Sequence, residues 1–425
     1  MSWFSSKSEN TAVQNFYPIT TYAKGYGSLT DKDTEWTCAS NRGFQTETKT
    51  WYSVLEDGSL LLMQVIWSYV GVFVIPATAQ FTFKHYNPKT KKATWKSVNG
   101  SNFKANGHGC KCDQFEVKHE GSANGTETYT ITGALDKNVQ LNVTLTRPAD
   151  APGFKFGEGP DGGFSTFGKS REDGKRDGLV VHRFHPIVHS SGSVILDGQV
   201  VDAKGDGMFV HAIQGMRPDS IASRWNFAFF TSGGGKEESK LGAVRAIQME
   251  FETTDAYGPT GPKSGRTKVN IGTVYTTAKS PVPFLAVGQT SVNSSATFTD
   301  GVDKASTDIS SAKHISPVHD SETGYDAPSG IEFKWSGDRR DGEGRLTATL
   351  TVDKLGATQG EGGLIEKVDV LQEIPYVIRK ALAAVTGTKP YIYQYHNAAT
   401  LQVEVDGETI PVHGWLFNEA SFVSE

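Results

Sequence analysis

Residues 139–146, VQLNVTLT, and residues 345–352, RLTATLTV, alternate apolar and polar side chains at every position. Successive side chains of a β-strand point to opposite faces of a sheet, so a period of two is typical of strands with one buried and one wet face. Shorter segments with the same period lie at residues 81–85, 115–118, 129–132 and 269–275. These stretches predict an all-β fold of antiparallel strands.

The segments between these strands predict tight turns. Asn-Gly and Asp-Gly pairs, which supply the positive φ angles of hairpins, stand at residues 57–58, 99–100, 124–125 and 197–198. Residues 364–385 carry an approximate helical stripe of apolar residues interrupted by Pro375, and we expect one kinked helix there. Residues 149–178 are rich in Gly, Pro and charged residues, which favours a long loop.

The most apolar run is LLLMQVIWSYVGVFVI, residues 60–75. A membrane-spanning helix needs about 20 apolar residues, and this run is shorter and contains Gln64 and Ser68. Its β-branched and aromatic content is typical of buried strands. We therefore predict strands here.

The length of 425 residues is too great for one ordinary core, because domains are typically about 100–250 residues long. We expect an N-terminal segment, residues 1–40, that is partly disordered. A first domain is expected at residues 41–220 and a second at residues 221–425, with the junction after the Gln214-Gly215-Met216 turn.

Charge and cysteine content restrict the classes of partner and compartment. The net charge is −5, and without a basic run the chain lacks the footprint of a nucleic-acid binder. Three cysteines, Cys38, Cys110 and Cys112, are too few for a disulfide framework. Residues 1–14 show no apolar signal region. These features predict reduced thiols and a cytoplasmic location.

Two segments imitate functional motifs. Residues 163–170, GFSTFGKS, fit the P-loop pattern, but their flanks predict neither the strand nor the helix that a phosphate site needs. His182 and His185 fall on opposite faces of a strand and cannot bind one metal ion together. No local set pairs a nucleophile with a base. We therefore expect no catalytic residues, no metal and no cofactor.

Aromatic side chains gather in or beside the predicted strands. Many belong to the core, and the alternative is that some line an apolar cavity, as in small β-barrels. The candidate ligand-lining residues are Trp67, Phe73, Phe81, Phe83, Phe184, Trp225 and Phe227, with His182 and Gln214 as the polar groups.

With these stretches in view, the chain resembles the fungal oxidative-stress survival-factor family. The similarity runs in order from about residue 45 to the end. The blocks that carry it are residues 58–90, VHRFHP at 181–186, residues 208–230, residues 246–258 and 267–275, residues 365–403 and LFNEASFV at 416–423.

The resemblance implies two tandem lipocalin-like antiparallel β-barrels. It also implies a cytosolic, sometimes nuclear protein on the cytosolic face of endoplasmic reticulum and Golgi membranes. The implied function is non-enzymatic binding and transfer of ceramide between those membranes, which supports sphingolipid synthesis and survival under oxidative stress. Members often begin with an amphipathic docking helix, but residues 5–11 here are polar. Trp3 and Phe4 are then the expected membrane contacts.

Two alternatives stay open from the sequence. Similar paired lipocalin-like folds include hydratases and pericyclases, which need few catalytic groups because a shaped cavity positions the substrate. In that case His182 and Gln214 are the first candidate polar groups. A protein-binding scaffold acting through residues 300–329 is the other alternative.

Overall fold

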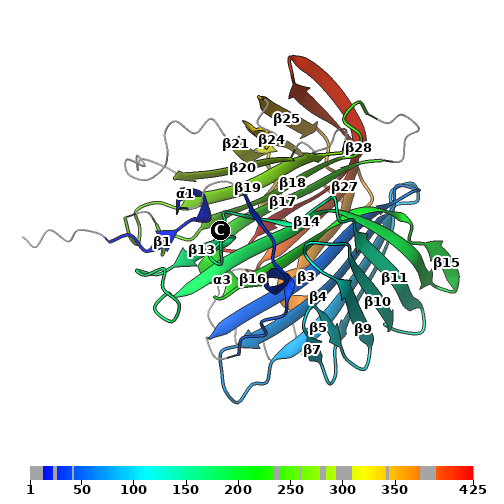
Figure 1. The fold of residues 1–425 in the computed structure, drawn as a ribbon, viewed down its shortest axis with the longest axis horizontal. Helices are drawn as coiled ribbons and strands as arrows, with labels where there is room; N and C mark the ends of the chain where they lie inside the picture. The colour runs from blue at the N-terminus through cyan, green and yellow to red at the C-terminus, as the bar shows by residue number, and fades with distance from the viewer. Residues whose placement is uncertain are drawn as a thin grey trace, which may run out of the picture.

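Two large antiparallel β-sheets make up the computed structural model of this chain (Figure 1). The structure describes residues 13–22, 26–40, 43–233, 239–258, 260–277, 284–292, 309–340, 344–373 and 389–424. Within these ranges helices are short, and strands form both layers. The all-β prediction is confirmed, and each sheet curls as a half-barrel.

The N-terminal sheet has the strand order β6-β5-β4-β3-β16-β14-β11-β10-β9-β8-β7, with five short strands beside this path. Its strands are β1 (Phe16–Tyr17), β2 (Tyr26–Ser28), β3 (Phe44–Leu55), β4 (Leu60–Val70), β5 (Thr78–Asn87), β6 (Lys92–Asn99), β7 (Lys104–Asn106), β8 (Gly109–Lys111), β9 (Phe115–Gly121), β10 (Glu127–Ala134), β11 (Val139–Arg147), β12 (Phe154–Phe156), β13 (Phe164–Phe167), β14 (Gly178–Leu196), β15 (Gln199–Asp202) and β16 (Gly205–Gln214).

The C-terminal sheet has the order β20-β19-β18-β17-β28-β27-β25-β24-β21, and β26 pairs with β27. Its strands are β17 (Ala222–Ser232), β18 (Val244–Thr253), β19 (Thr267–Thr276), β20 (Phe284–Val292), β21 (Ile309–Ile315), β24 (Gly330–Asp338), β25 (Arg345–Val352), β26 (Leu364–Asp369), β27 (Tyr391–Val405) and β28 (Glu408–Phe422). The remaining elements are β22 (Val318–His319), β23 (Asp326–Ala327), α1 (Ile19–Tyr22), α2 (Asp31–Thr34), α3 (Pro218–Ile221) and α4 (Val370–Glu373).

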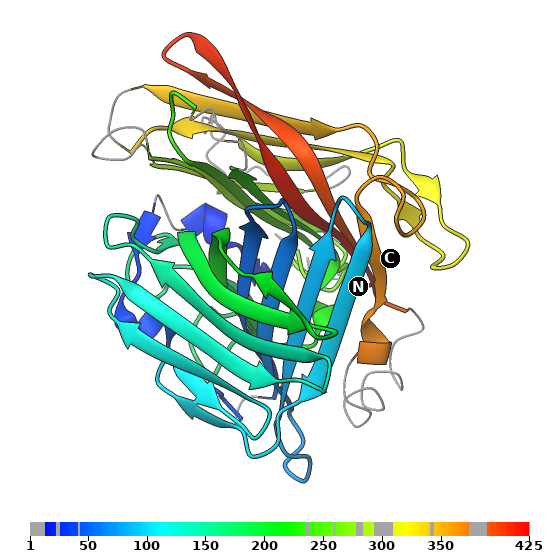
Figure 2. The ribbon, with the colours of Figure 1, turned by 90° about the vertical axis from the view of Figure 1, so that its right-hand side faces the viewer.

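The N-terminal sheet curls around a core of its own (Figure 2). Phe81 on β5 and Phe115 on β9 are far apart in strand order, yet their ring centroids lie 4.9 Å apart. Odd-numbered residues of β4, such as Met63 and Val65, belong to this interior core. The alternation of side chains sends the even-numbered residues Leu60 and Leu62 to the opposite face.

That opposite face packs on the C-terminal sheet (Figure 2). Tyr52 of β3 lies with its ring centroid 5.2 Å from that of Phe227 and 5.3 Å from that of Phe417. Phe229 is fully buried in the same cluster. One core therefore joins both sheets, and residues of each sheet depend on the other for burial.

Ionic groups fill part of the N-terminal interior. His211 Nδ1 lies 2.9 Å from the carbonyl oxygen of Asp33, and Nε2 lies 2.8 Å from Glu47 Oε1. Because a carbonyl only accepts, Nδ1 carries a proton, and a second proton must lie between Nε2 and Glu47. Nearby, Lys155 and Arg183 pair with the Asp33 carboxylate at 2.9 and 3.2 Å. This interior is a packed core with paired charges.

The predicted helix over residues 364–385 is wrong at its start. Leu364–Asp369 form β26, which pairs with β27 from Leu364↔Tyr395 to Asp369↔Tyr391, and α4 covers only Val370–Glu373. The apolar spacing fits either element, and the long β27 supplies a partner that local sequence does not reveal. Residues 374–385 lie outside the described residues.

One further segment differs from expectation. The sequence predicts a loop at residues 149–178, but β12 and β13 lie within them and pair with β14. The P-loop-like letters at residues 163–170 thus include a strand, β13. The described part of residues 1–40 is also packed, since Phe16 is 1% exposed and pairs with Phe167. Both segments are held in place by strands that are distant from them in the sequence.

The shared core gives a stability prediction. Phe229→Ala should lower the free energy of unfolding by about 3–5 kcal/mol, because it leaves a cavity between the sheets. Urea unfolding at neutral pH measures this change. Val200→Ala, at a side chain 72% exposed, is the control and should stay within about 0.5 kcal/mol of the parent. A loss below about 1 kcal/mol for Phe229→Ala would contradict a shared core.

Candidate ligand site between the sheets

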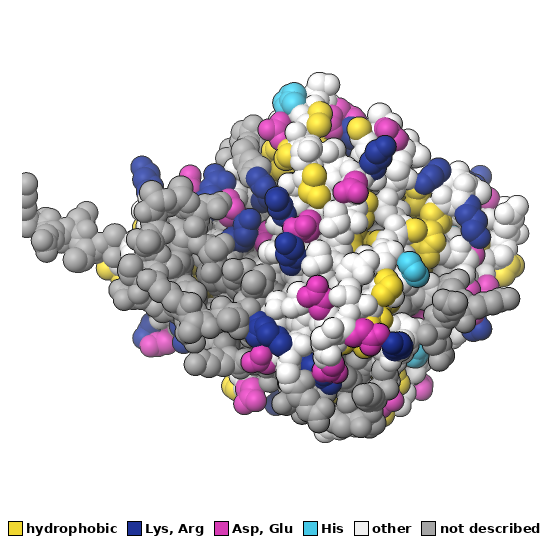
Figure 3. Space-filling view, turned by 90° about the horizontal axis from the view of Figure 1, so that it is seen from above, with side chains coloured by type: hydrophobic (Ala, Val, Ile, Leu, Met, Phe, Trp, Pro, Cys, Tyr) yellow, Lys and Arg dark blue, Asp and Glu magenta, His cyan; other side chains and the backbone are white. Residues whose placement is uncertain are grey.

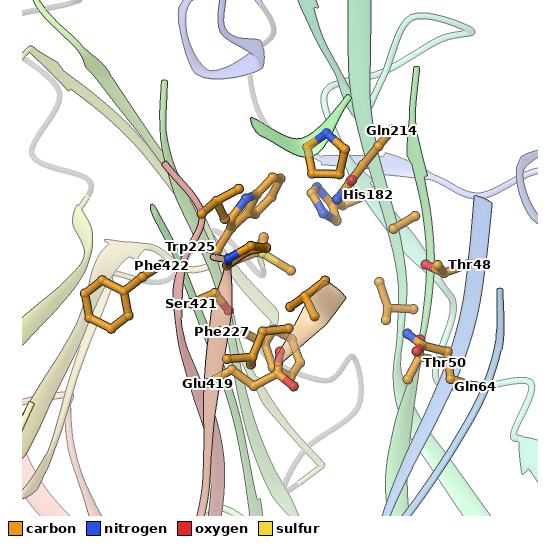
Figure 4. A pocket seen from close by; sticks show the side chains of 18 of the residues that line it. Thr48, Thr50, Gln64, His182, Gln214, Trp225, Phe227, Glu419, Ser421 and Phe422 are labelled. Atoms are coloured by element: carbon orange, nitrogen blue, oxygen red, sulfur yellow. The ribbon is translucent and has the colours of Figure 1, made fainter. Parts of the chain in front are cut away.

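A pocket of about 300 Å³ lies where the two sheets stop packing against each other (Figure 4). Its lining residues come from strands of both sheets, and several of them lie near strand ends. Gln214 is the last residue of β16, Ser421 and Phe422 end β28, and Trp225 lies near the start of β17. Pro218 of α3 and Leu371 of α4 complete one side. The site is thus built at one end of the interface.

Strand alternation explains which side chains reach this space. On β3, Thr48, Thr50 and Tyr52 line the pocket, whereas Trp51 belongs to the interior core. On β28, Glu419 and Ser421 line it. Figure 4 shows Thr48 and Thr50 on one side of this space and Glu419 and Ser421 on the other. A shift of one residue in either register would exchange the lining for core residues.

His182 is the polar group at one end of the pocket. It is 4% exposed, and its ring packs edge-on against Trp225 with centroids 6.1 Å apart. Among the described residues no side-chain hydrogen bond holds its ring. Burial alone lowers the pKa of His182 to about 4, because the charged form is poorly solvated here. The imidazole is therefore neutral at physiological pH and has hydrogen-bonding capacity to offer a ligand.

Glu419 is one of two acidic residues in the pocket lining, and the other, Asp219, pairs with Arg217 at 2.7 Å. Gln394 Nε2 donates to Glu419 Oε1 at 2.6 Å, and Lys84 donates to Gln394 and to Glu366 Oε2, the latter at 2.8 Å. Burial raises the pKa of Glu419, although Gln394 and Lys84 act in the opposite direction. This network connects β5 of the N-terminal sheet to β26, β27 and β28 of the C-terminal sheet.

The rest of the lining is mostly apolar, with a short polar row on one wall. Gln64 Nε2 donates to Thr50 Oγ1 at 2.8 Å, and Thr48 stands beside them. A concave apolar site with a few converging polar groups is the usual form of a small-molecule site, and such sites span about 300–1,000 Å³. The pocket suits an apolar ligand with a small uncharged polar group.

Four of the nine predicted ligand residues line this pocket: His182, Gln214, Trp225 and Phe227. Their role in binding stays a prediction, but the structure brings them together from β14, β16 and β17. β14 and β16 pair in the N-terminal sheet, and α3 stands between β16 and β17 in the chain.

The other five predicted residues do not line this pocket, and a role for them in ligand binding stays a prediction. Trp67 is 5% exposed on the interior face of β4, and Phe81 and Phe83 are in the interior core. Phe184 stacks on Phe154 of β12 with centroids 5.2 Å apart. Phe73 is 97% exposed at a loop tip. Aromatic content alone does not distinguish the two faces of a strand.

Sequence reasoning missed Glu419, Thr48, Thr50 and Gln64. Gln64 gave a usable signal, since it is a polar residue within the apolar run at residues 60–75. Glu419 gave none, because its neighbours Gln394 and Lys84 are remote in sequence. Only the pairing of β27 with β28 brings Gln394 opposite Glu419.

A second cluster has the composition of a metal site. Ligand atoms of His108, His119 and Glu127 lie within 4.8 Å of one another. The two imidazoles stack with centroids 4.1 Å apart and planes at 29°, so their in-plane lone pairs run nearly side by side and do not converge on one ion. Arg147 also donates to Glu127 Oε2 at 2.9 Å. The geometry is that of a buried ion pair with stacked histidines.

The strands define a double lipocalin-like protein with a pocket between its halves. The chain belongs to the Svf1 family, whose family model matches residues 1–424. The ceramide-binding protein SVF1 of Debaryomyces hansenii is 31% identical over 419 residues, which cover 96% of this chain and 92% of that protein. The ceramide-binding protein SVF1 of Yarrowia lipolytica is 30% identical, with 94% and 91% covered.

A solved structure supports the fold. The crystal structure of an AttH protein from Nitrosomonas europaea matches with a TM-score of 0.51 at 12% identity, covering 94% of this chain and 98% of that one. The lipocalin-like prediction is thereby confirmed at the level of fold. In the described part of the chain, no helix has the length and apolarity to span a bilayer, and residues 60–70 of the apolar run form strand β4.

The depressed pKa of His182 gives a pH prediction. The unfolded imidazole titrates near 6.5, so below that pH the unfolded chain takes up a proton that the folded chain does not bind until about pH 4. Folding stability is therefore lost as the pH falls, by about 2 kcal/mol at pH 5 from this group. His182→Asn should lose about 2 kcal/mol less than the parent between pH 7 and pH 5, measured by urea unfolding.

Val200→Ala is the control, because this side chain is 72% exposed and carries no titratable group. Its loss of stability between pH 7 and pH 5 should equal that of the parent. An equal loss in His182→Asn as well would show that His182 is not buried in its neutral form.

Proposed function

We propose that this chain is a non-enzymatic ceramide-binding protein that transfers ceramide between endoplasmic reticulum and Golgi membranes from their cytosolic side. Its relatives in two yeasts are named ceramide-binding proteins, and the inter-sheet pocket is an apolar site with few polar groups. Support for sphingolipid synthesis and for survival under oxidative stress, and a nuclear pool in addition to the cytoplasmic one, are part of the same proposal.

The observation that carries the proposal is that two titratable residues of the pocket, His182 and Glu419, both disfavour charge. Burial lowers the pKa of the base His182 and raises the pKa of the acid Glu419, so both shifts favour the uncharged forms. Ceramide presents an amide and hydroxyls and carries no charge. Neutral imidazole, amide and hydroxyl side chains can exchange hydrogen bonds with such a head group.

The volume restricts how a two-chain lipid is held. About 300 Å³ lies at the lower end of ligand pockets, so the described pocket takes the head group and the adjoining methylenes. The chains then continue past α4, where Val370 and Leu371 form part of the wall. Each methylene removed from a bilayer needs about 0.8 kcal/mol of compensation, which apolar wall residues provide.

The enzyme alternative, a hydratase or pericyclase, is less well supported. A general base works best with a pKa near the working pH, and burial lowers the pKa of His182 to about 4. At neutral pH His182 is then a weak base, and the single N–H of its neutral ring is a much weaker acid than an imidazolium. The same neutral side chain serves well as a hydrogen-bonding group for a bound lipid.

Two tryptophans test the pocket. Trp225 lines it, whereas Trp67 is buried on the opposite face of its sheet. Trp225→Ala should weaken ceramide binding at least about tenfold with a modest loss of stability. Trp67→Ala should cost about 3–5 kcal/mol of stability and leave the affinity of the folded protein unchanged. Binding of a fluorescent ceramide and urea unfolding measure the two effects, and the reverse pattern would place the ligand inside the N-terminal sheet.

Transfer between vesicles tests the activity. The protein should accelerate ceramide movement from donor to acceptor liposomes, and ceramide recovered by extraction should be chemically unchanged by mass spectrometry. Sphingosine, which has a protonated amine in place of the amide, should bind at least about tenfold more weakly at pH 7, because the pocket disfavours charge at His182 and Glu419. A converted lipid would establish the enzyme instead, and equal binding of sphingosine would remove the electrostatic argument.

A further inference from the structure

The loop between β4 and β5, residues 71–77, exposes three consecutive apolar side chains. Val72, Phe73 and Val74 are 43%, 97% and 82% exposed. The other large apolar side chains that are exposed in the described part of the chain are single valines on separate segments, Val13, Val200 and Val318. Scattered single residues are normal on a protein surface, whereas a contiguous apolar group marks an interaction site.

The backbone of this loop is built to present the two most exposed residues. The amide of Ile75 donates to the carbonyl of Val72 at 2.9 Å, which closes a β-turn with Phe73 and Val74 at its corners. Gly71, which precedes the turn, has a φ of +80° and packs closely against the backbone of Gly43. A Cβ added at Gly71 would lie 2.7 Å from the Gly43 carbonyl carbon, so only glycine fits here. Turn corners favour Gly, Asn, Asp or Pro, so bulky apolar residues here need another explanation.

The loop lies at the same end of the N-terminal sheet as the pocket. The pocket residue Gln214 pairs with Thr46, which pairs with Ser68, so all three stand in one row across the sheet. Neighbouring strands are about 4.8 Å apart, and β4 ends at Val70, two residues beyond Ser68. Ser68 is therefore about 10 Å across the sheet from the pocket residue Gln214. The loop begins three residues beyond Ser68, so its base lies near that end of the pocket.

Charge does not oppose burial of this loop in an apolar medium. Residues 71–77, GVFVIPA, contain no acidic or basic side chain. By contrast, the face of the molecule in Figure 3 carries basic and acidic side chains spread among uncharged ones. Burial of residues 71–77 in hydrocarbon takes no ionised group out of water.

We propose that residues 71–77 form a membrane-contact loop that inserts Phe73 and Val74 into the surface of a lipid bilayer. The proposal rests on the proposed function in one respect, since a bilayer is where a carrier exchanges its lipid. The loop then brings the end of the inter-sheet pocket to the membrane, so that a lipid moves a short distance between bilayer and protein.

A loop of this size gives weak, reversible attachment. Full burial of one Phe side chain favours partition into an apolar phase roughly tenfold to a hundredfold. A single lipid chain of fourteen carbons also gives only reversible membrane binding. A carrier that leaves one membrane for another requires such reversibility.

Flotation of the full-length chain with phosphatidylcholine liposomes tests the loop. Phe73→Ser should reduce the partition coefficient at least about tenfold, with urea stability unchanged because the side chain is exposed. Val200→Ser and Val318→Ser remove exposed valines elsewhere and should float like the parent. Because the loop is uncharged, the loss in Phe73→Ser should be the same at low and high salt and with added phosphatidylserine.

Membrane contact through residues 71–77 and ceramide binding in the pocket can be tested independently of each other. Phe73→Ser should still bind fluorescent ceramide in solution with parental affinity but transfer it more slowly between vesicles. Unchanged flotation of Phe73→Ser would overturn the loop as a membrane contact, whatever the ceramide result. Loss of a dimer in sedimentation without loss of flotation would assign the loop to a second copy of the chain and would equally overturn the proposal.

Discussion

Tyr52 packs between Phe227 and Phe417, with ring centroids 5.2 and 5.3 Å away, and this contact joins one strand of the N-terminal sheet to two strands of the C-terminal sheet. The ligand pocket depends on it. Where large rings meet, the sheets are in close contact. Toward the strand ends the facing residues become Thr48, Gln214 and Ser421, which are too small or too polar to fill the space, and a cavity remains.

This arrangement also explains why neither curled sheet needs an empty interior. Trp51, Phe81 and Phe209 pack the N-terminal interior, and paired charges such as Arg147 with Glu127 occupy one part of it. Single small barrels hold ligands inside. Here the outer faces of two sheets line the candidate pocket, so each sheet can keep a close-packed core while the interface contains the cavity.

Local sequence predicted the strands, because a period of two is a property of each segment alone. VQLNVTLT at 139–146 became β11 with Val143 and Leu145 fully buried. Prediction from local sequence failed where a remote partner decides the structure, as for Leu364–Asp369, which pair with β27. The same limit separates the pocket residues that local sequence could propose from those that it could not. His182 and Phe227 could be proposed from their strands, but Glu419 depends on Gln394, and Phe73 became a surface residue because β4 ends at Val70.

Electrostatics and topology combine at this end of the molecule. The pocket disfavours charge at His182 and Glu419, while Lys84 and Glu366 pair at 2.8 Å outside its lining, so the charges that join the two sheets are kept apart from the ligand. An uncharged apolar loop stands at the same strand ends. If the proposed transfer takes place here, a neutral amphiphile would move from membrane to pocket without moving a charge through an apolar medium, and the high cost of moving a charge would disfavour ionised lipids.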